Sequence, residues 1–80
     1  MLEIVHYLNM AYNLLITGER IKELRLERKL TMVQLATAIG TKHGLVSRWE
    51  SGHYAPSPGF IYELSKFFNI SADYLLGLVD

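Results

Sequence analysis

Cysteine is absent from this chain of 80 residues, so the chain forms neither disulfides nor thiolate metal sites. Proline is scarce, since Pro56 and Pro58 are the only two and both fall in one loop. Hydrophobic residues make up 50% and charged residues 20%, which is typical of a folded globule rather than a disordered tail. A chain this short supports one hydrophobic core, and we expect no separate small-molecule effector domain.

Net charge is also lacking, because eight Lys and Arg balance eight Asp and Glu. The distribution is uneven: residues 19–54 carry seven basic side chains against four acidic ones, and Glu3 is the single charge in residues 1–18. A local basic surface suits a phosphate-bearing partner. The sequence has neither the apolar run of a membrane span nor the basic start of a signal peptide. We therefore predict a cytoplasmic protein with no membrane partner.

Patterns of catalytic and metal-binding residues are missing as well. The three histidines, His6, His43 and His53, lack the spacing of metal ligands. No nucleophile stands in a motif with a base, and the glycines do not form a phosphate-binding loop. We therefore expect no enzyme, no metal and no cofactor.

The first 17 residues, MLEIVHYLNMAYNLLIT, are mostly apolar and predict an amphipathic helix. At about 100° per residue, the polar side chains fall on one third of its circumference, namely Glu3, His6, Asn9, Asn13 and Thr17. The wide apolar arc either packs on its own domain or also forms a homodimer interface. A strand-like arm, or an artefact of an upstream start codon with Met10 as the true start, are the remaining alternatives. Thr17 and Gly18 predict a break, and hence a boundary between residues 1–17 and a domain over residues 18–80.

The residues that follow predict a helix over residues 19–29 and a second helix that ends at Gly40. Most basic side chains of the first of these are expected to be solvated, including Arg20, Lys22, Arg28 and Lys29. Thr31 and Gln34 have the spacing of a capping box for the second.

Two further helices are predicted after the proline-containing loop. Ser57 precedes a helix over residues 58–68, with Pro58 in its first turn. Ser71 precedes a last short helix that Gly77 closes. No strand is predicted anywhere, so the expected fold class is all-α.

The stretch from Leu35 to Gly52 predicts two short helices joined by a glycine turn. Ala36 offers almost no side chain, so the second helix can cross close to the first, and Gly40 can take the positive φ of the turn. Val46 and Trp49 lie three residues apart and predict the inner face of the second helix. The outward residues are Lys42, His43, Ser47 and Arg48. A helix with such an outer face is what a DNA major groove admits.

Five motifs follow one another in the chain: GERIKELRLERKLT, QLATAIG, VSRWESG, PS before a leucine-bearing helix, and NISADYLLG. Through them, Gly18 to Gly77 resembles the Cro and phage-repressor helix-turn-helix family, also called the XRE family. The resemblance implies a compact five-helix repressor-type domain, to which residues 1–17 add an amphipathic N-terminal helix. It also implies a homodimer on a palindromic operator in double-stranded DNA, with half-sites about 34 Å apart.

The resemblance implies DNA contacts on and around the third helix of this domain. The positions that match the family's DNA-binding residues are Thr41, Lys42, His43, Gly44, Ser47 and Arg48 for the helix and its start, and Met32, Ser51 and Tyr54 for the phosphates. It also implies a structural ion pair between Arg25 and Glu50. Arg48 is the strongest candidate for reading a base, since its guanidinium matches the edge of guanine.

These observations predict a sequence-specific DNA-binding transcriptional regulator, a repressor by the same resemblance. The alternative is a protein-interaction module, antitoxin-like or otherwise partner-binding, on a helix-turn-helix scaffold with weak DNA binding. Three features favour the alternative: Met32 cannot donate a hydrogen bond to phosphate, Gly44 puts no side chain at a base-reading position, and the net charge is zero.

Overall fold

The computed structural model describes the backbone of residues 2–80 and the side chains of residues 14–80. Its five helices are α1 (Leu2–Glu27), α2 (Met32–Ile39), α3 (His43–Glu50), α4 (Pro58–Phe68) and α5 (Ala72–Leu75). No strand occurs over residues 2–80, and the predicted all-α, five-helix class is confirmed.

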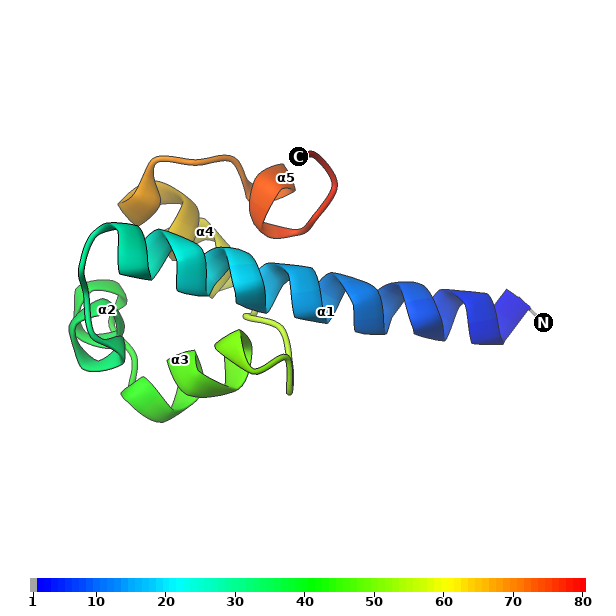
Figure 1. Ribbon diagram of the computed structural model, residues 1–80, viewed down its shortest axis with the longest axis horizontal. Coiled ribbons are helices and arrows are strands. Elements are labelled where there is room, and N and C mark those ends of the chain that lie inside the picture. The colour runs from blue at the N-terminus through cyan, green and yellow to red at the C-terminus, as the bar shows by residue number, and fades with distance from the viewer. Residues whose placement is uncertain (1) are drawn as a thin grey trace.

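The long helix α1 is the axis of the molecule. Figure 1 shows α2 and α3 on one side of its C-terminal half, and α4 and α5 on the other. The N-terminal half of α1 extends beyond all four of them, so the molecule measures 42 × 23 × 21 Å. The additional N-terminal segment is therefore part of the first helix of the domain rather than a helix of its own.

The break predicted at Thr17 and Gly18 was wrong, because α1 runs through both residues. Gly18 is buried where α1 crosses the end of α3. A Cβ at this position would overlap the main-chain oxygen of Trp49 and lie 3.0 Å from that of Glu50. The glycine therefore permits a close approach of two helices instead of ending one.

The polar arc predicted for residues 1–17 lies mostly outside the described side chains. Its last member, Thr17, is described and is only 3% exposed, so it belongs to the interior of the domain.

The core forms where the C-terminal half of α1 meets the other four helices. Each of the five contributes at least one side chain that is 0% exposed: Ile21, Leu35, Val46, Leu64 and Leu75. Burial of such a side chain stabilises the fold by about 1.5–3 kcal/mol. Trp49, at 2% exposed, is the largest side chain buried among them, which fixes α3 against the core.

Local capping sets the helix ends as predicted. The Thr31 hydroxyl accepts from the Gln34 main-chain N–H at 3.0 Å, and the Thr31 N–H donates to the Gln34 side chain at 2.8 Å, which completes the capping box. Ser57 caps α4, which begins at Pro58. Gly77 follows α5 with φ of 79°.

Arg20 differs from the prediction that it is a solvated charge, because it is half-buried, whereas Arg28 is exposed as predicted but also has a partner within the chain. The Arg20 guanidinium donates to the main-chain oxygens of Tyr74 and Val79 and lies over the Tyr74 ring. Arg28 donates to the Phe67 oxygen at 2.9 Å, at the end of α4. Arg20 thus attaches α1, and Arg28 attaches the turn that follows α1, to segments that come after α3 in the chain.

Candidate nucleic-acid interface

The turn between α2 and α3 is tight. Gly40 adopts φ 81° and ψ 37°, a left-handed conformation that glycine takes without strain. The main-chain N–H of Thr41 donates to the Ala36 oxygen at 2.8 Å, which closes the end of α2. Ala36 is 2% exposed, so its small side chain lets α3 cross close to α2.

Helix α3 is held by its inner face. Val46 and Trp49 are buried, and the Trp49 ring packs at a tilt against Phe60 of α4, with 5.3 Å between the ring centroids. Helices α1, α2 and α4 pack against α3, so the side of α3 that faces away from them is open to solvent.

The residues predicted to contact DNA lie at the turn and along α3, and three of the six are exposed. Lys42 is the N-cap residue and is exposed, and its side chain makes no capping hydrogen bond. His43 and Arg48 are exposed, whereas Thr41, Gly44 and Ser47 are half-buried. The structure thus places all six predicted positions from residue 41 to residue 48 at the turn or on α3.

A polar cluster lies at the C-terminal end of α3. The Arg48 guanidinium donates to the Tyr54 hydroxyl at 3.2 Å, and the Ser51 hydroxyl donates to the Arg48 main-chain oxygen at 3.2 Å. His53 Nδ1 lies 2.7 Å from the Ser51 oxygen. The structure therefore brings Ser51 and Tyr54 to Arg48 and adds His53, which sequence analysis considered only as a metal ligand.

Met32 stands apart from the other predicted contact residues. It is the first residue of α2, and its half-buried side chain packs against the core. A thioether in this position offers no hydrogen-bond donor to a phosphate.

Arg25 and Glu50 form a bidentate ion pair between α1 and the last residue of α3. Arg25 Nε lies 2.7 Å from Glu50 Oε2, and Nη2 lies 2.9 Å from Oε1. Arg25 also donates to the Leu30 oxygen at 2.8 Å. The hydrogen bonds to the Glu50 carboxylate, aided by its charge and opposed by burial, raise the pKa of Arg25 above its ordinary value.

Internal partners reduce the basic surface that is available to DNA. Of the seven basic side chains in residues 19–54, Arg20, Arg25 and Arg28 are bound to main-chain oxygens or to Glu50. The other four are exposed and form no ion pair within the described side chains: Lys22, Lys29, Lys42 and Arg48. Two of these four, Lys42 and Arg48, stand at the two ends of α3.

Comparison with known proteins agrees with this geometry. A family model described as helix-turn-helix matches residues 21–75, which include α2, the turn and α3. The chain belongs to this helix-turn-helix family. The resemblance to the Cro and phage-repressor proteins is thereby confirmed.

Two curated relatives of this helix-turn-helix protein are bacterial and phage regulators. It is 36% identical over 62 residues to the uncharacterized HTH-type transcriptional regulator YobD of Bacillus subtilis, a match that spans 78% of this chain and 55% of YobD. It is 33% identical over 64 residues to the repressor protein C2 of Salmonella phage P22, across 80% of this chain and 30% of that protein. The chain thus matches about half or less of the length of these relatives.

A solved structure shares the fold. The P22 c2 repressor, crystallised in complex with a synthetic operator, superposes with a TM-score of 0.73 at 33% identity. The match covers 76% of this chain and 92% of the repressor chain. YobD is named as a transcriptional regulator and C2 as a repressor.

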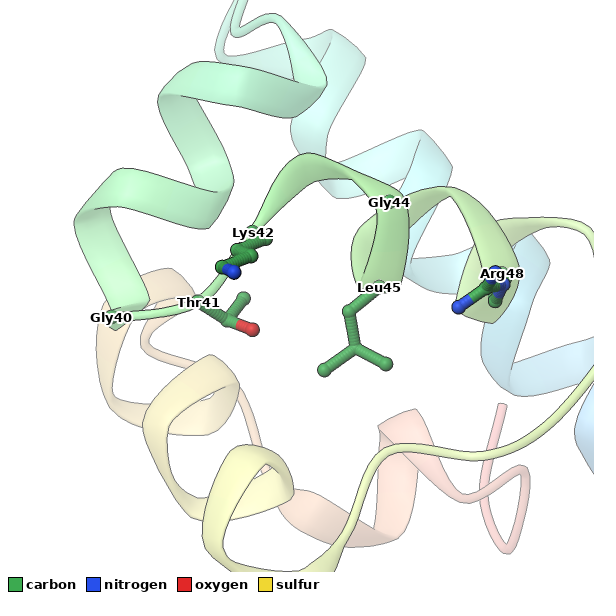
Figure 2. A pocket seen from close by; sticks show the side chains of 6 residues that line it. All are labelled: Gly40, Thr41, Lys42, Gly44, Leu45 and Arg48. Carbon is green, nitrogen blue, oxygen red and sulfur yellow. The ribbon is translucent and has the colours of Figure 1, made fainter.

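A surface concavity of about 580 Å³ lies beside the start of α3 in the helix-turn-helix. Figure 2 shows its lining, which consists of Gly40, Thr41, Lys42, Gly44, Leu45 and Arg48. Sequence analysis did not select Leu45, because a leucine in a helix is normally a core residue. Leu45 packs against the core, as a leucine in a helix normally does, and it also lines the concavity with Thr41 of the preceding turn.

Two kinds of feature are absent from the described part of the chain. Among its residues, no group of three or more His, Asp or Glu side chains is placed to hold a metal ion. No helix there combines the length and hydropathy that crossing a bilayer requires.

Proposed function

We propose that this protein is a sequence-specific transcriptional regulator, a cytoplasmic repressor, that inserts α3 into the major groove of an operator. The observation that carries the proposal is the side of α3 that faces away from the buried Val46 and Trp49. Exposed His43 and Arg48 lie on α3, exposed Lys42 lies at its start, and Lys42 and Arg48 line the concavity. The operator-bound P22 c2 repressor supports it, because its fold and sequence are similar.

The roles of the site residues follow from their positions. Arg48 is exposed on α3 and supplies the planar fork that pairs with guanine O6 and N7. Lys42 and the cluster of Ser51, His53 and Tyr54 lie at opposite ends of α3, where the helix meets the phosphates that flank the groove. Phosphate contacts of this number give modest, salt-dependent affinity.

Selection of bound duplexes from a random-sequence DNA library at moderate salt tests this function. We expect a palindromic motif, and we expect Arg48→Ala to relax discrimination at one base pair of each half-site by about 1–3 kcal/mol. Lys66→Ala is the matched control, because Lys66 is also a cationic side chain but lies on α4 and is paired with Glu63. Enrichment of no motif by the folded protein would contradict the proposal.

We further propose that the protein binds as a homodimer and that the N-terminal half of α1 is the dimerisation element. By helical register, Ile4 and Leu8 lie on the same side of α1 as Leu15, which is 56% exposed. An apolar helix of three turns that extends beyond its own domain is marginal in water without a cover. A second copy supplies that cover without charge repulsion, since Glu3 is the single charge in residues 1–18.

The solution mass, measured by sedimentation equilibrium, tests the dimer. Leu8→Lys is expected to give monomers, whereas His6→Lys, on the opposite side of α1 by register, is expected to remain dimeric. A wild-type monomer at all concentrations, or a Leu8→Lys dimer as stable as the wild type, would exclude this interface.

The extension of α1 also supports a second candidate, an antitoxin-like module that binds another protein and binds DNA weakly. The two candidates differ in their retention on nonspecific DNA at low salt. A DNA-binding regulator is retained and released as salt rises, with a logarithmic slope of about 0.9 per phosphate contact. An interaction module passes through the column.

A further inference from the structure

The loop that follows α3 is joined to the end of that helix by hydrogen bonds. The main-chain oxygen of Arg48 accepts from the Ser51 hydroxyl at 3.2 Å and from the His53 main-chain N–H at 3.0 Å. The Ser51 oxygen in turn lies 2.7 Å from His53 Nδ1. The imidazole of His53 is therefore held by one of its two nitrogens, although the residue is exposed.

The hydrogen of Ser51 determines which nitrogen of His53 carries a hydrogen. A hydroxyl has one hydrogen to donate, and a carbonyl oxygen can only accept. Because the Ser51 hydrogen is directed to the Arg48 oxygen, the Ser51 oxygen accepts from His53, and Nδ1 is the nitrogen that carries the hydrogen. In the neutral ring, Nε2 then has a lone pair and no hydrogen. Neutral His53 can accept a hydrogen bond through Nε2 but cannot donate one.

A DNA phosphate is an anion that accepts hydrogen bonds, so it binds donors and repels a lone pair. When the imidazole takes up a proton from solvent, Nε2 becomes a donor and the ring becomes a cation. We propose that His53 binds an operator phosphate only as the imidazolium, so that each half-site takes up one proton on binding. The inference rests on the proposed function, since it requires DNA at the C-terminal end of α3.

The charged groups of α3 make the proton uptake depend on DNA. The guanidinium of Arg48 is bonded to the hydroxyl of Tyr54, the residue next to His53, so it opposes a second positive charge in the free protein. The carboxylate of Glu50 does not offset this cation, because it is directed to Arg25 and is only 3% exposed. A phosphate bound at the loop supplies the negative charge that favours the imidazolium.

Helix α1 also contacts this loop, where Leu15 lies against Gly52. The charged residue one turn farther along α1 is Glu19, which is exposed, so water and salt screen its carboxylate. The other histidine of the interface, His43, is the first residue of α3 and so lies at the opposite end of that helix. Histidine changes its charge between about pH 5 and pH 8, and DNA affinity is therefore expected to fall as the pH rises through this range.

The position of the hydrogen can be measured without DNA, by two-dimensional NMR that correlates the imidazole nitrogens with the ring hydrogens. In the free protein at pH 8, we expect the hydrogen of His53 on Nδ1. Ser51→Ala removes the acceptor and is expected to let the hydrogen move to Nε2. A hydrogen on Nε2 of the wild-type protein at pH 8 would overturn the proposal.

Dissociation constants for the selected operator, measured at pH 6 and pH 8 and at the same salt concentration, test the proton uptake. A hydrogen bond to a charged group corresponds to about tenfold in affinity, so the wild type is expected to bind about tenfold more tightly at pH 6. His53→Gln is expected to lose this difference. His6→Gln is the matched control, since His6 lies on the N-terminal half of α1, and it is expected to keep the difference.

Ser51→Ala distinguishes this mechanism from a merely structural role of the loop. With no acceptor at position 51, the neutral ring can carry its hydrogen on Nε2 and donate to phosphate. The variant is therefore expected to bind more tightly than the wild type at pH 8 and to show less than the tenfold difference. Equal weakening of binding at both pH values would indicate a structural role and overturn the proposal.

The outcomes separate this inference from the proposed function. Selective binding with equal affinity at pH 6 and pH 8 overturns the proton uptake and leaves the regulator intact. A pH dependence that persists in His53→Gln and disappears in His43→Gln does the same, since the other end of α3 then takes up the proton. Absence of any selective DNA binding overturns both proposals.

Discussion

Replacement of Gly18 by alanine is expected to destabilise the protein, although alanine is the better helix former. At an exposed helical position the change gains about 1 kcal/mol. At position 18 the new Cβ would overlap the main-chain oxygen of Trp49 and lie 3.0 Å from that of Glu50. Overpacking costs about 1–3 kcal/mol, and main-chain atoms cannot rotate away as a side chain can, so we take the upper value. The expected net loss is about 2 kcal/mol.

Thermal unfolding followed by circular dichroism measures this loss. For a domain of this size, 1 kcal/mol shifts the midpoint by about 4–8 °C, so Gly18→Ala is expected to melt about 8–16 °C below the wild type. Gly44→Ala is the control, because it is also in a helix but its Cβ meets nothing within 4 Å, and it is expected to melt about 4–8 °C higher. If Gly18→Ala melted at or above the wild-type temperature, the close approach of α1 to α3 would be refuted.

Three further predictions concern the contacts that hold α2 and α3. Glu50→Gln is expected to lower the free energy of unfolding, measured in urea, by about 3 kcal/mol, because it leaves Arg25 buried without a carboxylate. Replacement of both Arg25 and Glu50 by Met is expected to cost less. Equal losses in the single and the double variant would argue against the ion pair. Glu50 raises the pKa of Arg25, so the stabilisation from this shift is complete at any pH below the ordinary pKa of arginine and is lost only as the pH rises above it. The titration of Arg25 should therefore contribute no change in stability between about pH 6 and pH 9. Thr31→Ala is expected to cost about 1 kcal/mol through loss of the capping box, whereas Thr31→Ser should cost little; an unchanged urea midpoint for Thr31→Ala would show that the cap contributes nothing.

The helix ends that sequence analysis predicted well are those set by neighbouring residues. The capping box of Thr31 and Gln34, the left-handed Gly40 and the cap at Ser57 each depend on atoms within four residues, so their motifs are visible in the sequence. The outer side of α3 was predictable for a similar reason, since the spacing of Val46 and Trp49 defines the inner one.

The features that were mispredicted or missed depend on residues far along the chain. The main-chain oxygens of residues 49 and 50 leave no room for a Cβ at Gly18, and Arg20 is held by the oxygens of residues 74 and 79. No local pattern distinguishes such a glycine from a helix breaker, or such an arginine from a solvated one. Leu45 was missed because its position beside Thr41 at a surface concavity appears only once α2 and α3 are folded together.

The continuity of α1 joins its N-terminal half to the part of the domain that carries α3 through one uninterrupted helix. Helix α1 is fixed to α3 at two places, by the close approach at Gly18 and by the ion pair of Arg25, so α1 and α3 cannot rotate relative to each other. Each residue inserted upstream of these two points would turn the N-terminal half by about 100° and advance it by about 1.5 Å. In a dimer joined through that half, helical phase alone sets the angle between the two copies of α3. The spacing of the operator half-sites would then be encoded in the length of one helix rather than in a flexible linker.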